Sequence, residues 1–503
     1  MLGLFSNDDK HPLADSREAK RIIAAITAGE ALGALEDAGA WLESLTAEGG
    51  FKLAQRLDLV LRIDEAAMAN AIENILDSIA RRLGRDYPAQ HGATRALEAR
   101  QWEDAHNYWQ HLVAAYLDCL ARHDAAEKKD ADTIRSQMPL LWGRLVNALA
   151  AQLKWKQFRY GPVDPVYWQT LGRIYLAAVD AKAAQKPIAL YAGTPETTIE
   201  AEYLKVLIFH ATSMDKLQPL GIEIAERFIG YFMPYFSLIR EVRPENVYWV
   251  DAAKPLPPTR LAQLPEVTPT LRFFNGTRAV DAVNATIEQI RREERVPPGI
   301  NLGGAYDLET VIPVLQHLAV CWAPKPPMRS TARHRMSSPL KVVNGLDAIY
   351  RALESGVAEG AESWAIDDVS LGGLGAQVSS RVDWIRIGAM VGMQPHGGDN
   401  WLVGIVRRFV RTGQTQGAVG IETVSKTPRA VVADAGGLET AAILLDVPVA
   451  GEYVRAALAA NQLEAGVVLV VPYDGMTARL YPRDVVASGA GYVIANFFVQ
   501  SLG

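Results

Sequence analysis

The stretch Ala323-Pro-Lys-Pro-Pro327 divides this chain of 503 residues into two parts of different character. Each proline restricts its own backbone and that of the residue before it, so residues 323–328 are predicted to form a stiff linker. Residues 1–298 hold 15 of the 40 glycines, and residues 299–503 hold the other 25. Because glycine is unfavourable inside a helix and suits turns, we expect helices before the linker and short strands after it.

Residues 1–322, on the N-terminal side of the linker, are predicted to form a large all-α domain. Apolar residues recur there at three- and four-residue spacing, which is the period of one helix face, and Asp15 or Ser16 can cap the first helix. The Trp and Tyr residues of these segments are expected in the core. A small hairpin is expected within residues 246–275, where VYWV and LRFF are aromatic and β-branched runs. Helices are predicted at Trp102–Leu120, Met138–Leu153, Tyr167–Ala183, Glu200–Phe209, Ile222–Tyr231, Ala279–Arg291 and Leu308–Val320.

The C-terminal side is predicted to be all-β apart from one helix. Short apolar runs separated by glycine-containing turns have the spacing of a small antiparallel barrel, which we place at residues 329–431. Residues 345–356 (GLDAIYRALESG) are predicted to form a helix inserted into that barrel. A second, smaller β domain is expected at residues 432–503. The barrel strands are predicted at Trp364–Ile366, Ala376–Val378, Ile385–Met393, Trp401–Arg411 and Ala418–Val424.

Composition and charge exclude several classes of protein. Lys and Arg total 51 against 57 Asp and Glu, a net charge of −6, which argues against a chain that coats nucleic acid. Cys119 and Cys321 are too few and too far apart for a disulfide framework or a cysteine metal site. Phe228–Ile239, although apolar, has only 12 residues and is too short to span a membrane. These features predict a soluble, cytoplasmic protein.

Two motifs on the β side carry the functional signal. The linker leads into Arg329-Ser-Thr-Ala-Arg333, with Arg335 two residues further, and Asp368-Val-Ser-Leu-Gly-Gly373 follows on a predicted strand. The pairing of R-x-x-x-R at a barrel entrance with D-x-S-x-x-G on the barrel resembles the PilZ family of bacterial cyclic di-GMP receptors. The resemblance covers roughly residues 326–431, about a fifth of the chain, and includes the strand GIVRRFVR and the closing strand GAVGIETVS. It implies a PilZ-like antiparallel β-barrel that binds cyclic di-GMP.

The residue types suit such a ligand, which has two phosphates and guanine edges. A guanidinium can pair with phosphate or with guanine O6 and N7, and a carboxylate can accept the guanine N1–H and N2–H donors. A serine can bond to phosphate or to a neighbouring backbone group, and a glycine leaves room where ligand and backbone approach closely. The resemblance therefore implies a ligand site built from Arg329, Arg333, Arg335, Asp368, Ser370 and Gly373.

The motifs also have a plainer interpretation. A basic cluster after a Pro-rich linker can be a solvated hinge, and D-x-S-x-x-G can be an ordinary Asx turn between strands. The chain carries no H-E-x-x-H, C-x-x-C, G-x-S-x-G or P-loop pattern, and His106 and His111, five residues apart, do not share a helix face. We therefore expect no enzyme, no metal and no cofactor.

Two functional interpretations remain open on the sequence. The first is a cyclic di-GMP receptor that passes the signal to an unidentified protein partner through its helical domain. The second is an interaction scaffold whose barrel no longer binds nucleotide.

Overall fold

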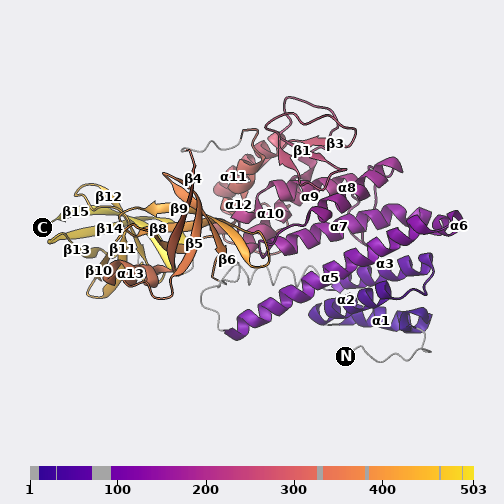
Figure 1. The fold of residues 1–503 in the computed structure, drawn as a ribbon, viewed down its shortest axis with the longest axis horizontal. Helices are drawn as coiled ribbons and strands as arrows, with labels where there is room; N and C mark the ends of the chain where they lie inside the picture. Colours follow the sequence, from indigo (N-terminus) through magenta and orange to yellow (C-terminus); the bar gives the residue numbers. More distant parts are fainter. Residues whose placement is uncertain are drawn as a thin grey trace.

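The computed structural model describes residues 11–29, 31–70, 92–325, 332–379, 384–463, 466–489 and 491–502. The helices gather at one end of the long axis of the molecule, and two barrels follow one another towards the other end (Figure 1). This arrangement confirms the predicted order of a helical region followed by β structure. Within the described residues, none of the helices combines the length and apolarity that crossing a membrane requires.

Each predicted helix is present in the N-terminal region. The first one is capped as expected, because Asp15 Oδ1 accepts the backbone N–H groups of Arg17 and Glu18 at 2.8 and 3.0 Å. The helices are α1 (Ser16–Ala28), α2 (Ala31–Ala47), α3 (Leu53–Asn70), α5 (Gly92–Ala125), α6 (Lys128–Ala131), α7 (Met138–Gln157), α8 (Pro165–Asp180), α9 (Ile199–Ala211), α10 (Pro219–Phe232), α11 (Thr277–Glu293) and α12 (Leu308–Trp322).

The aromatic residues of these helices form the core, as predicted. Trp109, Tyr116, Trp155, Trp168 and Tyr175 are buried. A tryptophan or tyrosine ring removes a large apolar area from water, so these rings supply much of the energy that packs the helices together. Two others of the set, Trp102 and Trp142, are half-buried and pack against the same core.

A buried carboxylate joins three of the helices. Asp64 of α3 is fully buried and accepts the hydroxyl of Tyr116 of α5 at 2.5 Å and that of Tyr191 at 3.2 Å. Arg144 of α7 lies 3.5 Å from the same carboxylate. Burial raises the pKa of Asp64 to about 6, against the opposing effect of Arg144. The network fixes the lateral positions of α3, α5 and α7.

The hairpin expected at residues 246–275 is a three-stranded antiparallel sheet, ordered β2-β1-β3. Its strands are β1 (Tyr248–Asp251), β2 (Thr259–Arg260) and β3 (Leu271–Phe274), with Tyr248 paired to Phe274. The rings of this pair stack at 5.2 Å between centroids, and both are buried against the helices. The sheet therefore belongs to the helical region.

The first barrel closes through six strands in the order β4-β5-β6-β9-β8-β7. Helix α13 (Leu346–Ser355) lies between its first two strands, which confirms the predicted insertion. The strand predicted at Ile385–Met393 begins only at Met390, because the preceding residues turn at Gly388, whose φ is 84°. The strands are β4 (His334–Asn344), β5 (Glu362–Ser370), β6 (Gly373–Ser379), β7 (Met390–Pro395), β8 (Leu402–Arg411) and β9 (Gln416–Ser425).

The second barrel repeats the topology of the first. Its order, β10-β11-β12-β15-β14-β13, is that of the first barrel with six added to each strand number. Strand β10 (Arg429–Ala435) pairs along its length with β11, so the boundary expected between residues 431 and 432 falls inside a strand. The other strands are β11 (Glu439–Leu444), β12 (Tyr453–Leu458), β13 (Leu469–Tyr473), β14 (Met476–Gly489) and β15 (Tyr492–Leu502).

The first barrel is packed between its two neighbours. On the helical side, the Arg411 backbone N–H donates to Tyr160 O at 2.7 Å, and the ring of Tyr160 contacts that of Phe409 at 5.5 Å. On the other side, the Tyr492 hydroxyl of the second barrel donates to Gly388 O at 2.9 Å, and α13 packs against strands of both barrels. Contacts on both sides thus hold the first barrel against the helices and the second barrel.

Candidate functional site

The residues of the two motifs meet where strands β4, β5 and β6 run side by side. Arg335 of β4 pairs with Asp368 of β5, and Asp368 pairs with Gly375 of β6. A β-bulge between Ile366 and Asp368 interrupts the alternation of β5, so that neither Asp367 nor Asp368 is buried. Bulges re-aim side chains in this way beside functional sites. The bulge accordingly leaves the motif carboxylate accessible on the barrel surface.

Arg333 and Asp368 form an ion pair across the two motifs. Arg333 Nη1 lies 2.6 Å from Asp368 Oδ1, and the two side chains are 35% and 29% exposed. Part-exposed pairs of this kind contribute only about 0–1 kcal/mol to stability. Both charged groups can therefore leave this ion pair and bind a ligand with little loss of stability. The Asp368 carboxylate bonds to a guanidinium from the other motif, which an isolated Asx turn does not explain.

The ion pair lies directly over Gly375. A Cβ atom added at Gly375 would meet Asp368 Oδ1 at 3.0 Å and Arg333 Nη1 at 3.5 Å. Gly375 pairs in turn with Gly420 of β9, so two glycines stand side by side on neighbouring strands. We call this side-chain-free surface, Gly375 and Gly420, the glycine floor. Sequence reasoning missed Gly375, although a third glycine closely follows Gly372 and Gly373.

Ser370 and Gly373 shape the turn that joins β5 to β6. The Ser370 hydroxyl donates to Gly373 O at 3.1 Å, which is the backbone alternative of its two predicted roles. A Cβ atom at Gly373 would lie 2.1 Å from Ile421 O of β9. The neighbouring strand thus requires a glycine at residue 373, whatever a ligand does there.

The structure describes one of the two remaining predicted arginines. Arg335 is exposed, and its guanidinium makes no hydrogen bond or ion pair to any of the described residues. Arg329 lies outside the described residues. The described part of the predicted set therefore places two arginines and one carboxylate together, with Ser370 and Gly373 in the adjoining turn.

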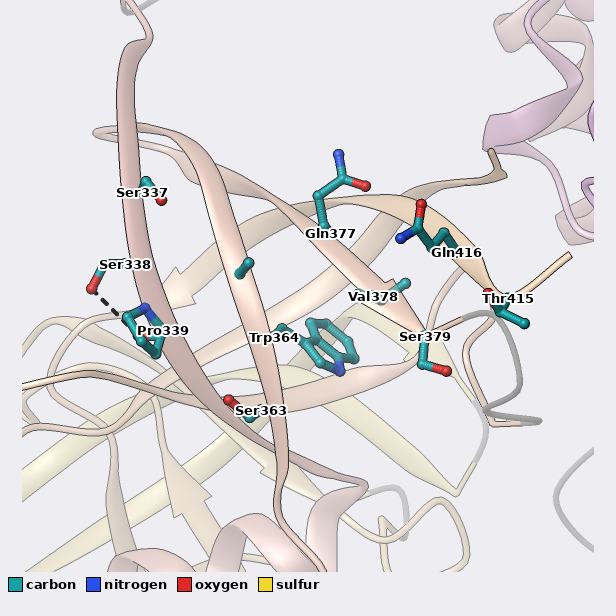
Figure 2. Close-up of a pocket in the computed structure, with 11 residues that line it drawn as sticks. Ser337, Ser338, Pro339, Ser363, Trp364, Gln377, Val378, Ser379, Thr415 and Gln416 are labelled. Atoms are coloured by element: carbon teal, nitrogen blue, oxygen red, sulfur yellow. Dashed lines mark hydrogen bonds between the residues drawn. The ribbon is translucent and has the colours of Figure 1, made fainter. Parts of the chain in front are cut away.

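A groove of about 920 Å³ runs along the same strands (Figure 2), and its lining residue Gln377 follows Gly375 by two positions on β6. Its walls come from β4, β5 and β6 and from the start of β9, and they offer hydroxyl and amide groups rather than charges. The Trp364 ring at its base is 3% exposed and stacks on Trp384 at 5.5 Å, so it is part of the barrel core. The lining residues include Ser337, Ser338, Ser363, Gln377, Ser379 and Gln416. A volume of this size is in the range of small-molecule sites.

The histidines and the basic strand of the barrel have other surroundings in the described part of the chain. Among the described residues, no three side chains of the types that bind metal ions come together. His106 stacks on Trp102 at 4.6 Å, and burial lowers its pKa to about 4. The two arginines of the strand GIVRRFVR are exposed, and each has an acidic partner: Arg407 pairs with Glu422, and Arg408 with Asp215.

Comparison with known protein families gives a match in another part of the chain. Residues 17–243 match the family model described as the N-terminal domain of the cyclic-di-GMP receptor FimW. No curated protein matches the chain. The crystal structure of the Borreliella burgdorferi PlzA protein in complex with c-di-GMP is among the solved structures found, at 6% identity and a TM-score of 0.14, covering 33% of this chain and 86% of that one.

The FimW match lies wholly before the barrel motifs. It confirms the resemblance to cyclic di-GMP receptors on residues that played no part in that prediction.

Proposed function

We propose that this protein is a cyclic di-GMP receptor whose binding site is the Arg333–Asp368 pair over the glycine floor. The observation that carries the proposal is the ion pair itself, which brings the two motifs together over a surface without side chains. The match of residues 17–243 to a cyclic di-GMP receptor domain supports the choice of ligand. Because this ligand is an intracellular second messenger, the proposal places the protein in the cytoplasm.

Binding is an exchange of partners within the site. Asp368 gives up Arg333 and accepts the N1–H and N2–H donors of a guanine. Arg333 and Arg335 then pair with phosphate oxygens or with guanine O6 and N7 as charge-assisted bonds, which are stronger than a half-exposed ion pair. The polar groove along the same strands receives the parts of the ligand that these residues do not contact.

The protein acts as a receptor and not as an enzyme under this proposal. The site supplies charge pairing and base recognition, and the signal passes to a protein partner through the helical region. The helical region is suited to that role because it contacts the barrel through Tyr160 and through the Arg408–Asp215 ion pair.

Titration calorimetry with cyclic di-GMP tests the binding site. Arg333→Ala and Asp368→Ala should each weaken binding by about ten- to a hundredfold, because a hydrogen bond to a charged group contributes about 1.5–3 kcal/mol. Asp368→Ala should also reduce the preference for cyclic di-GMP over cyclic di-AMP, since the carboxylate reads donors that adenine lacks. Arg429→Ala serves as a control, because Arg429 forms an ion pair with Asp474 on the second barrel at 2.5 Å. Unchanged binding in the double variant Arg333→Ala/Asp368→Ala would place the site elsewhere.

The alternative is a scaffold whose barrel binds no nucleotide. The observation in its favour is that Asp368 already has a partner within the chain. Absence of binding by the wild-type protein in the same titration would favour the scaffold.

A further inference from the structure

The helical region reaches the first barrel through an ion pair close to the proposed site. The Nε of Arg408 on β8 donates to Oδ2 of Asp215 in the short helix η3 (Met214–Lys216). Arg408 is 57% exposed, whereas Asp215 is 15% exposed. The carboxylate is therefore mostly buried in the helical surface, and the guanidinium is the more accessible partner.

Arg408 borders the glycine floor on the side away from Asp368. It pairs with Gly420, and a Cβ atom added at Gly420 would lie 3.3 Å from the Arg408 Cβ. Gly420 pairs with Gly375, over which the Arg333–Asp368 pair lies. Neighbouring strands are about 4.8 Å apart, so only about 10 Å of sheet separates β6 from β8. An extended arginine side chain covers much of that width.

A second bulge gives Arg408 its position. The register of β8 shifts between Val406 and Arg408, and both Arg407 and Arg408 are exposed although they are consecutive. Arg407 turns to Glu422 of β9, on the barrel itself. Arg408 has Asp215 of the helical region as its ion-pair partner. The floor is thus flanked by one guanidinium whose partner lies outside the barrel.

Resting on the proposed function, we infer that Arg408 is a further ligand residue, shared between a phosphate of the bound nucleotide and Asp215. A dinucleotide that lies on the glycine floor with one guanine at Asp368 carries its phosphates towards β8. Arg408 leaves the Asp215 carboxylate for a phosphate, and the helical region loses one of its attachments to the barrel. Such coupling is reciprocal: what weakens the Asp215 contact strengthens ligand binding by the same factor.

Calorimetric titration of the full chain with cyclic di-GMP tests the inference through four proteins: wild type, Asp215→Ala, Arg408→Ala and the double variant. Asp215→Ala should bind about two- to fivefold more tightly, because Arg408 no longer has to leave a part-exposed ion pair. Arg408→Ala should reduce the affinity for cyclic di-GMP by about tenfold or more. The double variant should match Arg408→Ala, because Asp215 acts only through that arginine.

Control variants come from the second barrel, where Arg429, 52% exposed and so similar to Arg408, forms an ion pair with Asp474. Asp474→Ala and Arg429→Ala should leave the affinity unchanged. Thermal melting shows whether each variant folds, and Asp215→Asn replaces Asp215→Ala if the latter does not.

The outcomes separate this inference from the proposed function. A wild-type protein that does not bind cyclic di-GMP refutes both. A wild-type protein that binds, with unchanged affinity in Asp215→Ala or in Arg408→Ala, refutes the role of Arg408 and leaves the site at Arg333 and Asp368 standing.

Discussion

At the residue scale, neighbouring glycines have different roles that depend on what faces each of them. Gly372 has open space where a Cβ would be, Gly373 faces the carbonyl of Ile421, and Gly375 faces the Asp368 carboxylate. The first is a turn residue, the second permits two strands to approach, and the third leaves the floor of the proposed site bare.

The contrast between Gly372 and Gly373 can be tested directly. Gly373→Ala would bring a Cβ to 2.1 Å from a backbone oxygen that cannot move aside, so β6 and β9 must separate. Overpacking of this kind costs about 1–3 kcal/mol, and sometimes more. Gly372→Ala should cost much less, because its new Cβ would have no other atom within 4 Å. Urea unfolding monitored by circular dichroism measures both, and equal stability of the two variants would contradict the assignment.

At the element scale, the contact between α8 and α9 makes stability depend on pH. His210, at the end of α9, packs edge-on against Trp168 of α8 at 4.7 Å between centroids. Burial lowers the pKa of His210 to about 4, so the folded protein keeps this imidazole neutral. The unfolded chain takes up the proton near pH 6.5. The contribution of His210 to the free energy of unfolding is therefore fully present above about pH 6.5 and is lost as the pH falls towards 4.

The expected size of this effect is about 1–2 kcal/mol at pH 5. Asp64 acts in the opposite direction: burial raises its pKa to about 6, so it favours the folded state increasingly as the pH falls through 6. His210→Gln isolates the histidine. Its melting temperature should fall less between pH 7 and pH 5 than that of the wild type, whereas His396→Gln, at an exposed turn residue, should show the wild-type fall. If the melting temperature of His210→Gln falls between pH 7 and pH 5 as much as that of the wild type, this contact does not contribute to the pH dependence of stability.

At the scale of the whole molecule, the two barrels share one topology but not one surface. Residue Arg455 is third in β12, as Gly375 is third in β6. Its guanidinium binds the Asp446 carboxylate at 2.7 and 2.8 Å and donates to Val424 O of the first barrel at 3.0 Å. The second barrel thus has an arginine that joins the two barrels at the strand position where the first barrel has Gly375 of the glycine floor.

We therefore expect binding at the first barrel alone. The double variant Arg333→Ala/Asp368→Ala should lose all measurable binding sites, because the second barrel has no equivalent floor to supply them. Equilibrium dialysis with labelled cyclic di-GMP counts the sites directly. Half of the wild-type capacity remaining at unchanged affinity would show that the second barrel also binds.

Features that depend on neighbours along the chain could be predicted from the amino-acid sequence. Helical period and a capping Asp15 were enough to predict the helices, and their aromatic residues form the core as expected. Local composition also predicted the inserted helix α13 and the all-β C-terminal half. The two motifs were predicted to act together, and Arg333 and Asp368, 35 residues apart, do meet. Periodicity and turn residues are local properties, so a single sequence carries them.

Only the tertiary structure decides which residues face one another across strands. The glycine floor depends on the register between β6 and β9, and the accessible positions of Asp368 and Arg408 depend on bulges. Strand pairing also determines that the second barrel begins at Arg429 and closes in the order of the first. Asp215 and Arg408 are 193 residues apart. Such contacts arise from how whole elements pack, and a one-residue change of register would replace every partner, so local sequence patterns do not encode them.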